Sequence, residues 1–294
     1  MIKSAIYEPR APRVERKLSI RGVNYCVHEW GSDDAPLLVY LHGWGDTGST
    51  FQFVVDALSA DWRVVAPDWR GFGRSPCYCT SYWFPDYLAD LHALLEGISP
   101  DAPLRLVGHS MGANVAALYA GTFPERVQAL VDIEGFGLVD SSPADAPSRY
   151  RAWIEASNGP MSFSEYDDIA SLAQRIARRN PAMAADEAAF VAREWATQEA
   201  DGKVRLRADP LHKLPNPVLY RRAEAEACWR AVTADTLLVI GGNSRFAQDF
   251  PVTTDGRMFA RNKTVVIDGA GHMLHFEVPG PLAAAIEEFL LPPL

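Results

Sequence analysis

The sequence has few of the features that mark membrane, secreted or nucleic-acid-binding proteins. Its longest apolar runs, such as PLLVYL and TLLVI, are far too short to span a bilayer. The first residues, MIKSAIYEPRAPRVERK, carry charge but no apolar stretch of the kind found in signal peptides. Acidic residues outnumber basic ones by 37 to 28, and the formal net charge is −9. With no stripe of Lys and Arg to attract a polyanion, we expect a cytoplasmic protein that binds neither nucleic acid nor a membrane.

Cysteine is also scarce, which argues against a metal centre or a disulfide-stapled fold. The four cysteines are Cys26, Cys77, Cys79 and Cys228. Cys77 and Cys79 are close in sequence, but no second pair of Cys or His accompanies them. We therefore expect reduced thiols and no bound metal.

Hydrophobic residues make up 48% of the 294 positions, enough for a large core. After an opening hairpin within residues 17–30, continuous apolar runs predict strands within 36–43, 62–71, 104–110, 127–135, 236–242 and 263–271. Helical patterns lie between them, at 48–59, 87–98, 111–123 and 281–291. This alternation predicts an α/β fold with a mostly parallel sheet and helices on both faces. Ligands of such folds bind at the carboxyl ends of the strands.

One interval breaks the alternation. Residues 138–222 show no strand-like run, only helical segments with Pro-rich joints. The prediction is a core domain built from residues 1–137 and 223–294, with a helical cap, residues 138–222, inserted over the carboxyl edge of the sheet. Phe136 and Trp153, together with Trp44, are the aromatic residues that we expect to line a pocket beneath the cap.

The stretch LVGHSMGANVA places Ser110 between Gly108 and Gly112, at the junction of a predicted strand and a predicted helix. A turn this tight tolerates almost no side chain at the flanking positions, and the serine then stands at a helix N-terminus. Ser110 is therefore the predicted nucleophile. A nucleophilic serine also needs an oxyanion hole, for which the backbone N–H groups of Trp44 and Met111 are the candidates.

A general base should follow the last strand, where the sequence reads VIDGAGHMLHFEVP. His272 comes after Gly269-Ala270-Gly271, which leaves the loop free to reach the serine, and it is the predicted base. His275 and His109 are expected to be packed, and His42 is expected to brace its loop.

The motifs HGWGD, DWRGFGRS, GHSMG and GAGH occur in the order found in the α/β-hydrolase fold family, which the chain resembles over nearly its whole length. Within that family it is most similar to the serine hydrolase-like esterases. The resemblance implies a serine hydrolase that cleaves a carboxylic ester or related acyl bond of a small substrate through an acyl-enzyme on Ser110. It implies no metal or organic cofactor.

The acidic member of the triad departs from the commoner family pattern. The usual acid position, in LLVIGGNSRF, is occupied by Ser244, which cannot orient a histidine electrostatically and is expected to matter little. The alternative family position is the end of the strand before the cap, where VDIEGFG offers Glu134. Glu134 is the predicted acid, and Asp132, Asp249 and Asp255 are the alternatives.

Two other functions fit the same sequence. Cofactor-free dioxygenases of heteroaromatic compounds share the HGW and PDWRGFGRSP motifs and keep a serine and a histidine. A non-catalytic protein that binds a small molecule in the same pocket is the third possibility. Oxygen consumption would indicate the second function, and failure of Ser110 to react with serine-directed probes would indicate the third.

Overall fold

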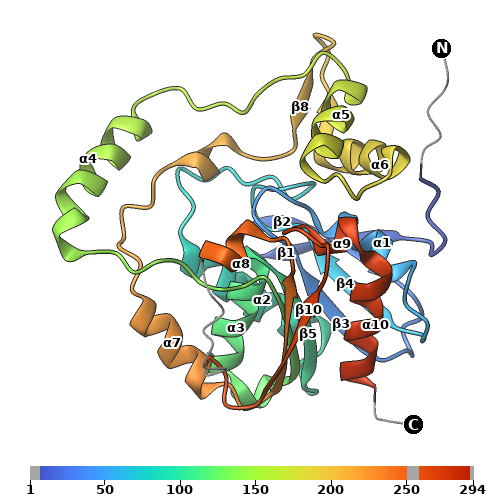
Figure 1. The fold of residues 1–294 in the computed structure, drawn as a ribbon. Coiled ribbons are helices and arrows are strands. Elements are labelled where there is room, and N and C mark those ends of the chain that lie inside the picture. Colours follow the sequence, from blue (N-terminus) through green and yellow to red (C-terminus); the bar gives the residue numbers. More distant parts are fainter. Residues whose placement is uncertain (1–6, 250–257, 292–294) are drawn as a thin grey trace.

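The computed structural model describes residues 7–249 and 258–291, which form one central sheet flanked by helices (Figure 1). The eight strands lie in the order β1-β2-β4-β3-β5-β6-β9-β10. Their bounds are β1 Val14–Ile20, β2 Val23–Trp30, β3 Leu37–Leu41, β4 Arg63–Pro67, β5 Leu104–His109, β6 Val127–Ile133, β9 Asp235–Gly241 and β10 Asn262–Ile267. Strand β2 pairs antiparallel with β1 and with β4, and all other neighbours are parallel. The prediction of a mostly parallel sheet is therefore confirmed.

Helices cover both faces of this sheet. One face packs against α2 (Phe84–Ile98), α3 (Met111–Thr122) and α7 (Arg222–Ala231), and the other against α1 (Gln52–Val55), α9 (Leu274–Glu277) and α10 (Pro279–Leu290). Helix α2 shows the reason: its buried residues Leu91, Leu94 and Leu95 follow Tyr87 at helical spacing, so one stripe faces the sheet. Helix α7 was not predicted from the sequence.

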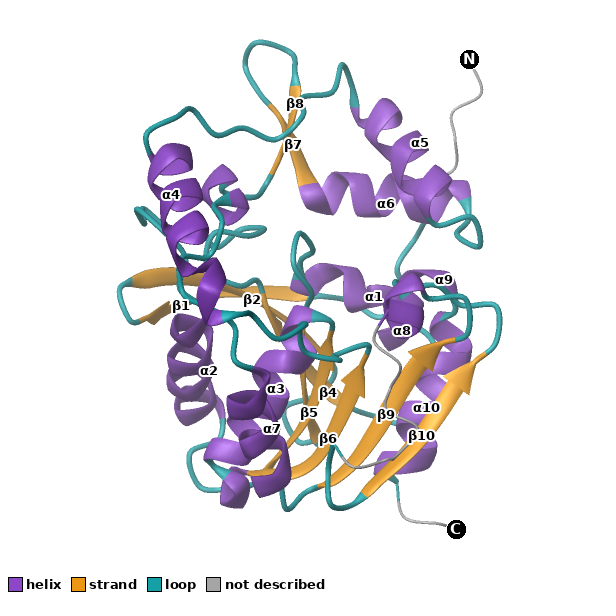
Figure 2. Cartoon of the chain, turned by 60° about the vertical axis from the view of Figure 1, so that its left-hand side comes forward, coloured by secondary structure: helices purple, strands orange, loops and turns teal. Residues whose placement is uncertain are grey.

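Residues 138–222, called the insertion below, lie over the carboxyl ends of the parallel strands, whose arrowheads point toward it in Figure 2. The insertion contains α4 (Ala146–Ser157), α5 (Ile169–Arg179) and α6 (Ala185–Trp195). The sequence predicts an all-helical insertion, but the structure differs. Strands β7 (Ala196–Gln198) and β8 (Val204–Leu206) form an antiparallel pair within it. Strands of three residues are too short to produce an apolar run that a sequence pattern could reveal.

The insertion is packed onto the core through α5 and α6, whereas α4 stands apart. Leu172, Ile176 and Val191 from α5 and α6 form one hydrophobic cluster with Phe53 and Phe276 of the core. Helix α4 has no buried residue, and it projects away from the sheet at the left of Figure 1.

The remaining short elements are η1 (Gly48–Phe51), η2 (Pro124–Arg126), η3 (Pro143–Asp145), η4 (Pro210–Lys213) and α8 (Arg245–Asp249). Within residues 7–249 and 258–291, no helix combines the length and the apolar character needed to cross a membrane. The expectation of four reduced cysteines was wrong for one pair, because Cys77 and Cys79 are joined by a disulfide. Cys26 and Cys228 are free thiols.

Candidate active site

Ser110 occupies a strained turn between β5 and α3. Its backbone angles are φ 51° and ψ −113°, a region that non-glycine residues rarely adopt. Both flanking glycines are required by sterics: a Cβ on Gly108 would lie 2.5 Å from Ala113 Cα, and one on Gly112 would overlap the Leu41 carbonyl. The Ser110 N–H donates to the Ile133 carbonyl at 2.8 Å, which ties the turn to β6. The side chain is therefore held, partly exposed, at the N-terminus of α3.

Glu134 and His272 are brought together at the same edge of the sheet. Glu134 follows β6 directly and is buried, with a positive φ of 59°, and His272 lies on the loop after β10. His272 Nδ1 is 3.0 Å from Glu134 Oε2. Since a carboxylate oxygen accepts hydrogen bonds, this contact places the proton on Nδ1 and leaves Nε2 free to accept one. The Ser110 hydroxyl makes no hydrogen bond to any described residue. In enzymes without substrate, the hydrogen bond between nucleophile and base is commonly long and shortens when substrate binds.

Ser244 contributes to this arrangement, contrary to the expectation from sequence. Its hydroxyl is buried and donates to Glu134 Oε2 at 2.5 Å, on the same oxygen that faces His272. The Gly241 N–H donates to Glu134 Oε1 at 2.8 Å. The strand order β5-β6-β9-β10 thus delivers Ser110, Glu134, Ser244 and His272 from four neighbouring strands. The sequence feature that could have predicted this role of Ser244 is a hydroxyl side chain at the position where the family usually has its acid.

Of the alternative carboxylates, Asp132 is not placed at His272. Asp132 is buried, its Oδ1 accepts from the Gly135 N–H at 2.7 Å, and burial raises the pKa of its carboxyl to about 7. Its side chain makes no contact with an imidazole among the described hydrogen bonds. Asp255 and the side chain of Asp249 lie outside the described residues.

The loop that carries Trp44 lies against the serine. A Cβ on Gly43 would lie 3.3 Å from Ser110 Cβ, so the backbone passes close to the nucleophile. His42 braces this loop, because its Nδ1 donates to the Gly43 carbonyl at 2.7 Å and its Nε2 accepts from the Trp69 N–H at 2.8 Å. The N–H groups of Trp44 and Met111 donate to no carbonyl or side chain in the described part of the chain. Both are available to a ligand oxygen.

Two further histidines are packed behind His272. His109 is buried, and its Nε2 contacts the His272 carbonyl at 2.8 Å. His275 is also buried, with its Nε2 2.9 Å from Asp46 Oδ2. Asp46 Oδ1 accepts from the indole N–H of Trp195 at 2.8 Å. These contacts fix the loop that presents His272 and connect it to the insertion.

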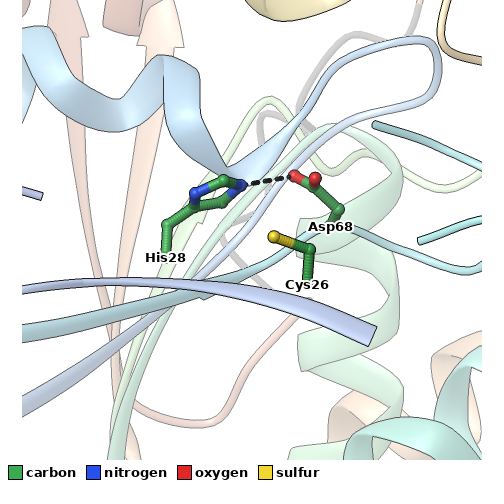
Figure 3. A group of neighbouring side chains, drawn as sticks. All are labelled: Cys26, His28 and Asp68. Atoms are coloured by element: carbon green, nitrogen blue, oxygen red, sulfur yellow. Dashed lines mark hydrogen bonds and ion pairs between the residues drawn. The ribbon is translucent and has the colours of Figure 1, made fainter. Parts of the chain in front are cut away.

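Three buried side chains elsewhere have the residue types of a metal site, namely Cys26, His28 and Asp68 (Figure 3). The figure shows the imidazole directed at the carboxylate, with His28 Nε2 3.1 Å from Asp68 Oδ1. Burial raises the pKa of the Cys26 thiol to about 11, so it stays protonated at neutral pH. Both Asp68 oxygens already accept backbone N–H groups, from Gly48 at 2.8 Å and Arg74 at 2.7 Å. The group fits a hydrogen-bonded brace better than a metal site, since metal binding requires a thiolate.

A cavity of about 870 Å³ separates the insertion from the core. Trp44 and His272 form part of its core side, and residues of α5 and of the β7–β8 pair form the opposite side. The expectation for the other two aromatic residues was wrong, because neither Phe136 nor Trp153 lines this cavity. Phe136 is buried, and Trp153 belongs to α4, which stands apart from the sheet.

Comparison with known proteins agrees with this geometry. The chain is 28% identical to a serine hydrolase-like protein of Danio rerio, over 90% of this chain and 84% of that protein. It is 26% identical to the 2-(acetamidomethylene)succinate hydrolase of Mesorhizobium japonicum, over 94% of this chain and 95% of that enzyme. Among solved structures, the thioesterase domain from the curacin biosynthetic pathway superposes with a TM-score of 0.84 at 26% identity, covering 94% of this chain and 99% of that domain. The model of the alpha/beta hydrolase fold matches residues 36–279, and the chain belongs to this family.

Proposed function

We propose that this protein is a serine hydrolase that cleaves a carboxylic ester or related acyl bond of a small substrate. The observation that carries the proposal is the 3.0 Å contact between His272 Nδ1 and Glu134 Oε2, next to Ser110 in its strained turn. Relatives named as serine hydrolase-like proteins and a structural neighbour named as a thioesterase domain support the same chemistry.

In the proposed reaction, Ser110 Oγ attacks the substrate carbonyl while His272 Nε2 takes its proton. Glu134 holds the imidazole in the required tautomer and stabilises the imidazolium that forms. His272 then protonates the leaving alcohol or thiol, and the acyl group remains on Ser110. In the second half, His272 removes a proton from water, which attacks the acyl-enzyme and releases the acid and the free serine.

The negative charge that develops on the carbonyl oxygen requires preorganised donors. The unbonded N–H groups of Trp44 and Met111 are suited to this role, the second because it belongs to the first residue of α3. The insertion acts as a cap that encloses the substrate in the cavity of about 870 Å³. A chamber of this size fits acyl groups of short or medium length better than long-chain triglycerides.

A fluorophosphonate probe tests the nucleophile. We expect covalent labelling on Ser110, located by mass spectrometry, and Ser110→Ala should abolish labelling and lower kcat by about 10⁶. Ser164→Ala is the matched control, because Ser164 lines the same cavity and should leave both unchanged. Labelling at another residue of active protein would overturn the assignment, and oxygen uptake with hydroxylated heteroaromatics would favour a dioxygenase.

A further inference from the structure

The cavity between the insertion and the core, which His272 lines, is also lined by four arginine residues. Arg175 and Arg179 lie one turn apart on α5, Arg207 follows β8, and Arg245 begins α8. None of the four forms an ion pair with a carboxylate of residues 7–249 or 258–291. Their described polar contacts are a hydrogen bond from Arg207 Nε to the Ala196 carbonyl at 3.1 Å and a stacking contact of Arg175 with the Tyr166 ring.

In contrast, two arginine residues of the loop after β4 form ion pairs with carboxylates. Arg70 makes a two-pronged ion pair with Asp90, and Arg74 pairs with Glu194 at 2.8 Å. The cavity arginines thus line one common space without an ion-pair partner, in a protein whose net charge is −9. Arg175, Arg179 and Arg245 are exposed and Arg207 is partly buried, so their guanidinium groups are accessible to a ligand in the cavity. Guanidinium groups that converge on one cavity can bind an anion, because each presents several N–H donors in a planar fork.

The carboxylates of the cavity do not neutralise these arginines. Asp46 is held by His275 and Trp195, and Glu277 accepts from the Gly271 N–H at 2.9 Å. Burial lowers the pKa of Arg207, and the nearby Arg74 acts in the same direction. Glu194, Asp68 and Glu15 act on the pKa of Arg207 in the opposite direction, but none of them forms an ion pair with it.

We propose that the substrate carries an anionic group, a carboxylate or a phosphate, in addition to its acyl bond, and that Arg175, Arg179 and Arg207 bind it. This inference rests on the proposed hydrolase function and names its substrate class. His272 and Trp44 line the same cavity as the arginines, and the loop that carries Trp44 passes beside Ser110. A molecule whose anion is bound by the arginines therefore extends toward the proposed base and nucleophile. The anion can sit on the acyl chain as a carboxylate, or on the leaving group as the phosphates of a carrier thiol.

Two matched substrate pairs distinguish these sources. The first compares the mono-4-nitrophenyl ester of adipate with 4-nitrophenyl hexanoate, which has the same chain without the carboxylate. The second compares S-hexanoyl-4′-phosphopantetheine with S-hexanoyl-pantetheine, which has the same thioester and carrier without the phosphate. In at least one pair, we expect kcat/KM to be about tenfold or more higher for the anionic member, with most of the difference in KM.

The arginine variants test the cause of the preference. Arg175→Gln/Arg179→Gln and Arg207→Gln should reduce the ratio of kcat/KM within that pair to nearly one. Arg178→Gln is the matched control, because Arg178 belongs to α5 but does not line the cavity, and it should retain the full ratio. A ratio near one in wild-type protein for both pairs, or a ratio that survives the cavity substitutions, would overturn the proposal.

A binding measurement separates this proposal from the proposed function. Calorimetry on Ser110→Ala should show binding of the preferred anionic substrate, and adding Arg175→Gln/Arg179→Gln should weaken it by about tenfold. Absence of Ser110 labelling together with arginine-dependent binding would contradict the hydrolase and retain the anion site. Labelling of Ser110 without arginine-dependent binding would retain the hydrolase and reject the anion site.

Discussion

The core and the insertion differ in whether their charged side chains near the cavity have partners within the protein. On the core side, two buried carboxylates are fully engaged: Glu134 accepts from Gly241, Ser244 and His272, and Asp46 from Thr50, Trp195 and His275. On the insertion side, Arg175, Arg179 and Arg207 have no carboxylate partner among the described residues. Buried charges that are satisfied within the protein hold one geometry, which chemistry at Ser110 needs. The arginines without a carboxylate partner are the groups that we propose bind the anion of the substrate.

The largest expected effect comes from breaking the core side at Glu134. Glu134→Gln keeps the shape but cannot stabilise an imidazolium, so kcat should fall by about 10⁴ with the fold intact, as measured on 4-nitrophenyl hexanoate and by circular dichroism. Asp132→Asn is the matched control on the same strand and should retain kcat. If Glu134→Gln keeps wild-type kcat while Asp249→Asn or Asp255→Asn loses it, the acid lies after β9.

The next effect concerns the attachment of the insertion to the core. Glu194 on α6 pairs with Arg13 at 3.0 Å and Arg74 at 2.8 Å. Burial alone would raise the pKa of Glu194, but these two guanidinium groups lower it to about 2. A depressed carboxyl pKa stabilises the fold above the unfolded pKa of about 4.5 and ceases to do so as pH falls toward 2.

Glu194→Gln should therefore lower the free energy of unfolding by up to about 3 kcal/mol at pH 7, measured by urea titration. The difference from wild type should shrink steadily as pH falls from about 5 to about 2, that is, from the unfolded to the folded pKa of the carboxyl. Glu165→Gln, at an exposed ion pair with Arg205, is the control and should change little at any pH. A difference that is independent of pH would contradict the ion-pair explanation.

A smaller effect is expected at Ser244, which positions the acid without touching substrate. Ser244→Ala removes the donor to Glu134 Oε2, so kcat should fall by about tenfold while KM changes little. The thermal midpoint should stay close to wild type, and Ser244→Thr should restore part of the rate. An unchanged kcat would return Ser244 to the passive role expected from sequence.

The smallest effect is expected at the contact between Trp195 and Asp46. Trp195→Phe removes an indole donor at 2.8 Å and should cost about 1 kcal/mol of unfolding free energy, measured in urea. Trp153→Phe on the separate helix α4 is the control, with no measurable change. Equal losses in both variants would show that the hydrogen bond does not matter.

The parts of the fold and site that sequence predicts are those set by local rules. Apolar runs located six strands of the central sheet, an opening hairpin accounted for the other two, and the sterics of a strand-to-helix turn located Ser110. Glu134 was predicted from the family resemblance, which gives the end of the strand before the cap as the alternative position of the acid. The structure brings Glu134 and His272 into contact, and their roles remain proposals.

What sequence did not predict depends on contacts between distant segments. Ser244 gains its contact with Glu134 only because β6 and β9 are neighbours, although 110 residues separate the two side chains. Trp153 is of a residue type that often lines pockets, but it lies on α4, which stands apart from the sheet, so it does not line the cavity. The role proposed for the arginines of α5 was also not predicted from the sequence, because the charged face of an amphipathic helix usually faces solvent.

The delivery of one residue from each of four neighbouring strands also bears on how such a site can change over evolutionary time. The imidazole of His272 can be approached by an acid from β6 or from β9, and Ser244 holds the second position in this chain. An acid can therefore move from one strand to its neighbour while the serine and the histidine stay in place. The segment after β9 does not supply the proposed acid in this chain, and it carries Arg245, which lines the cavity.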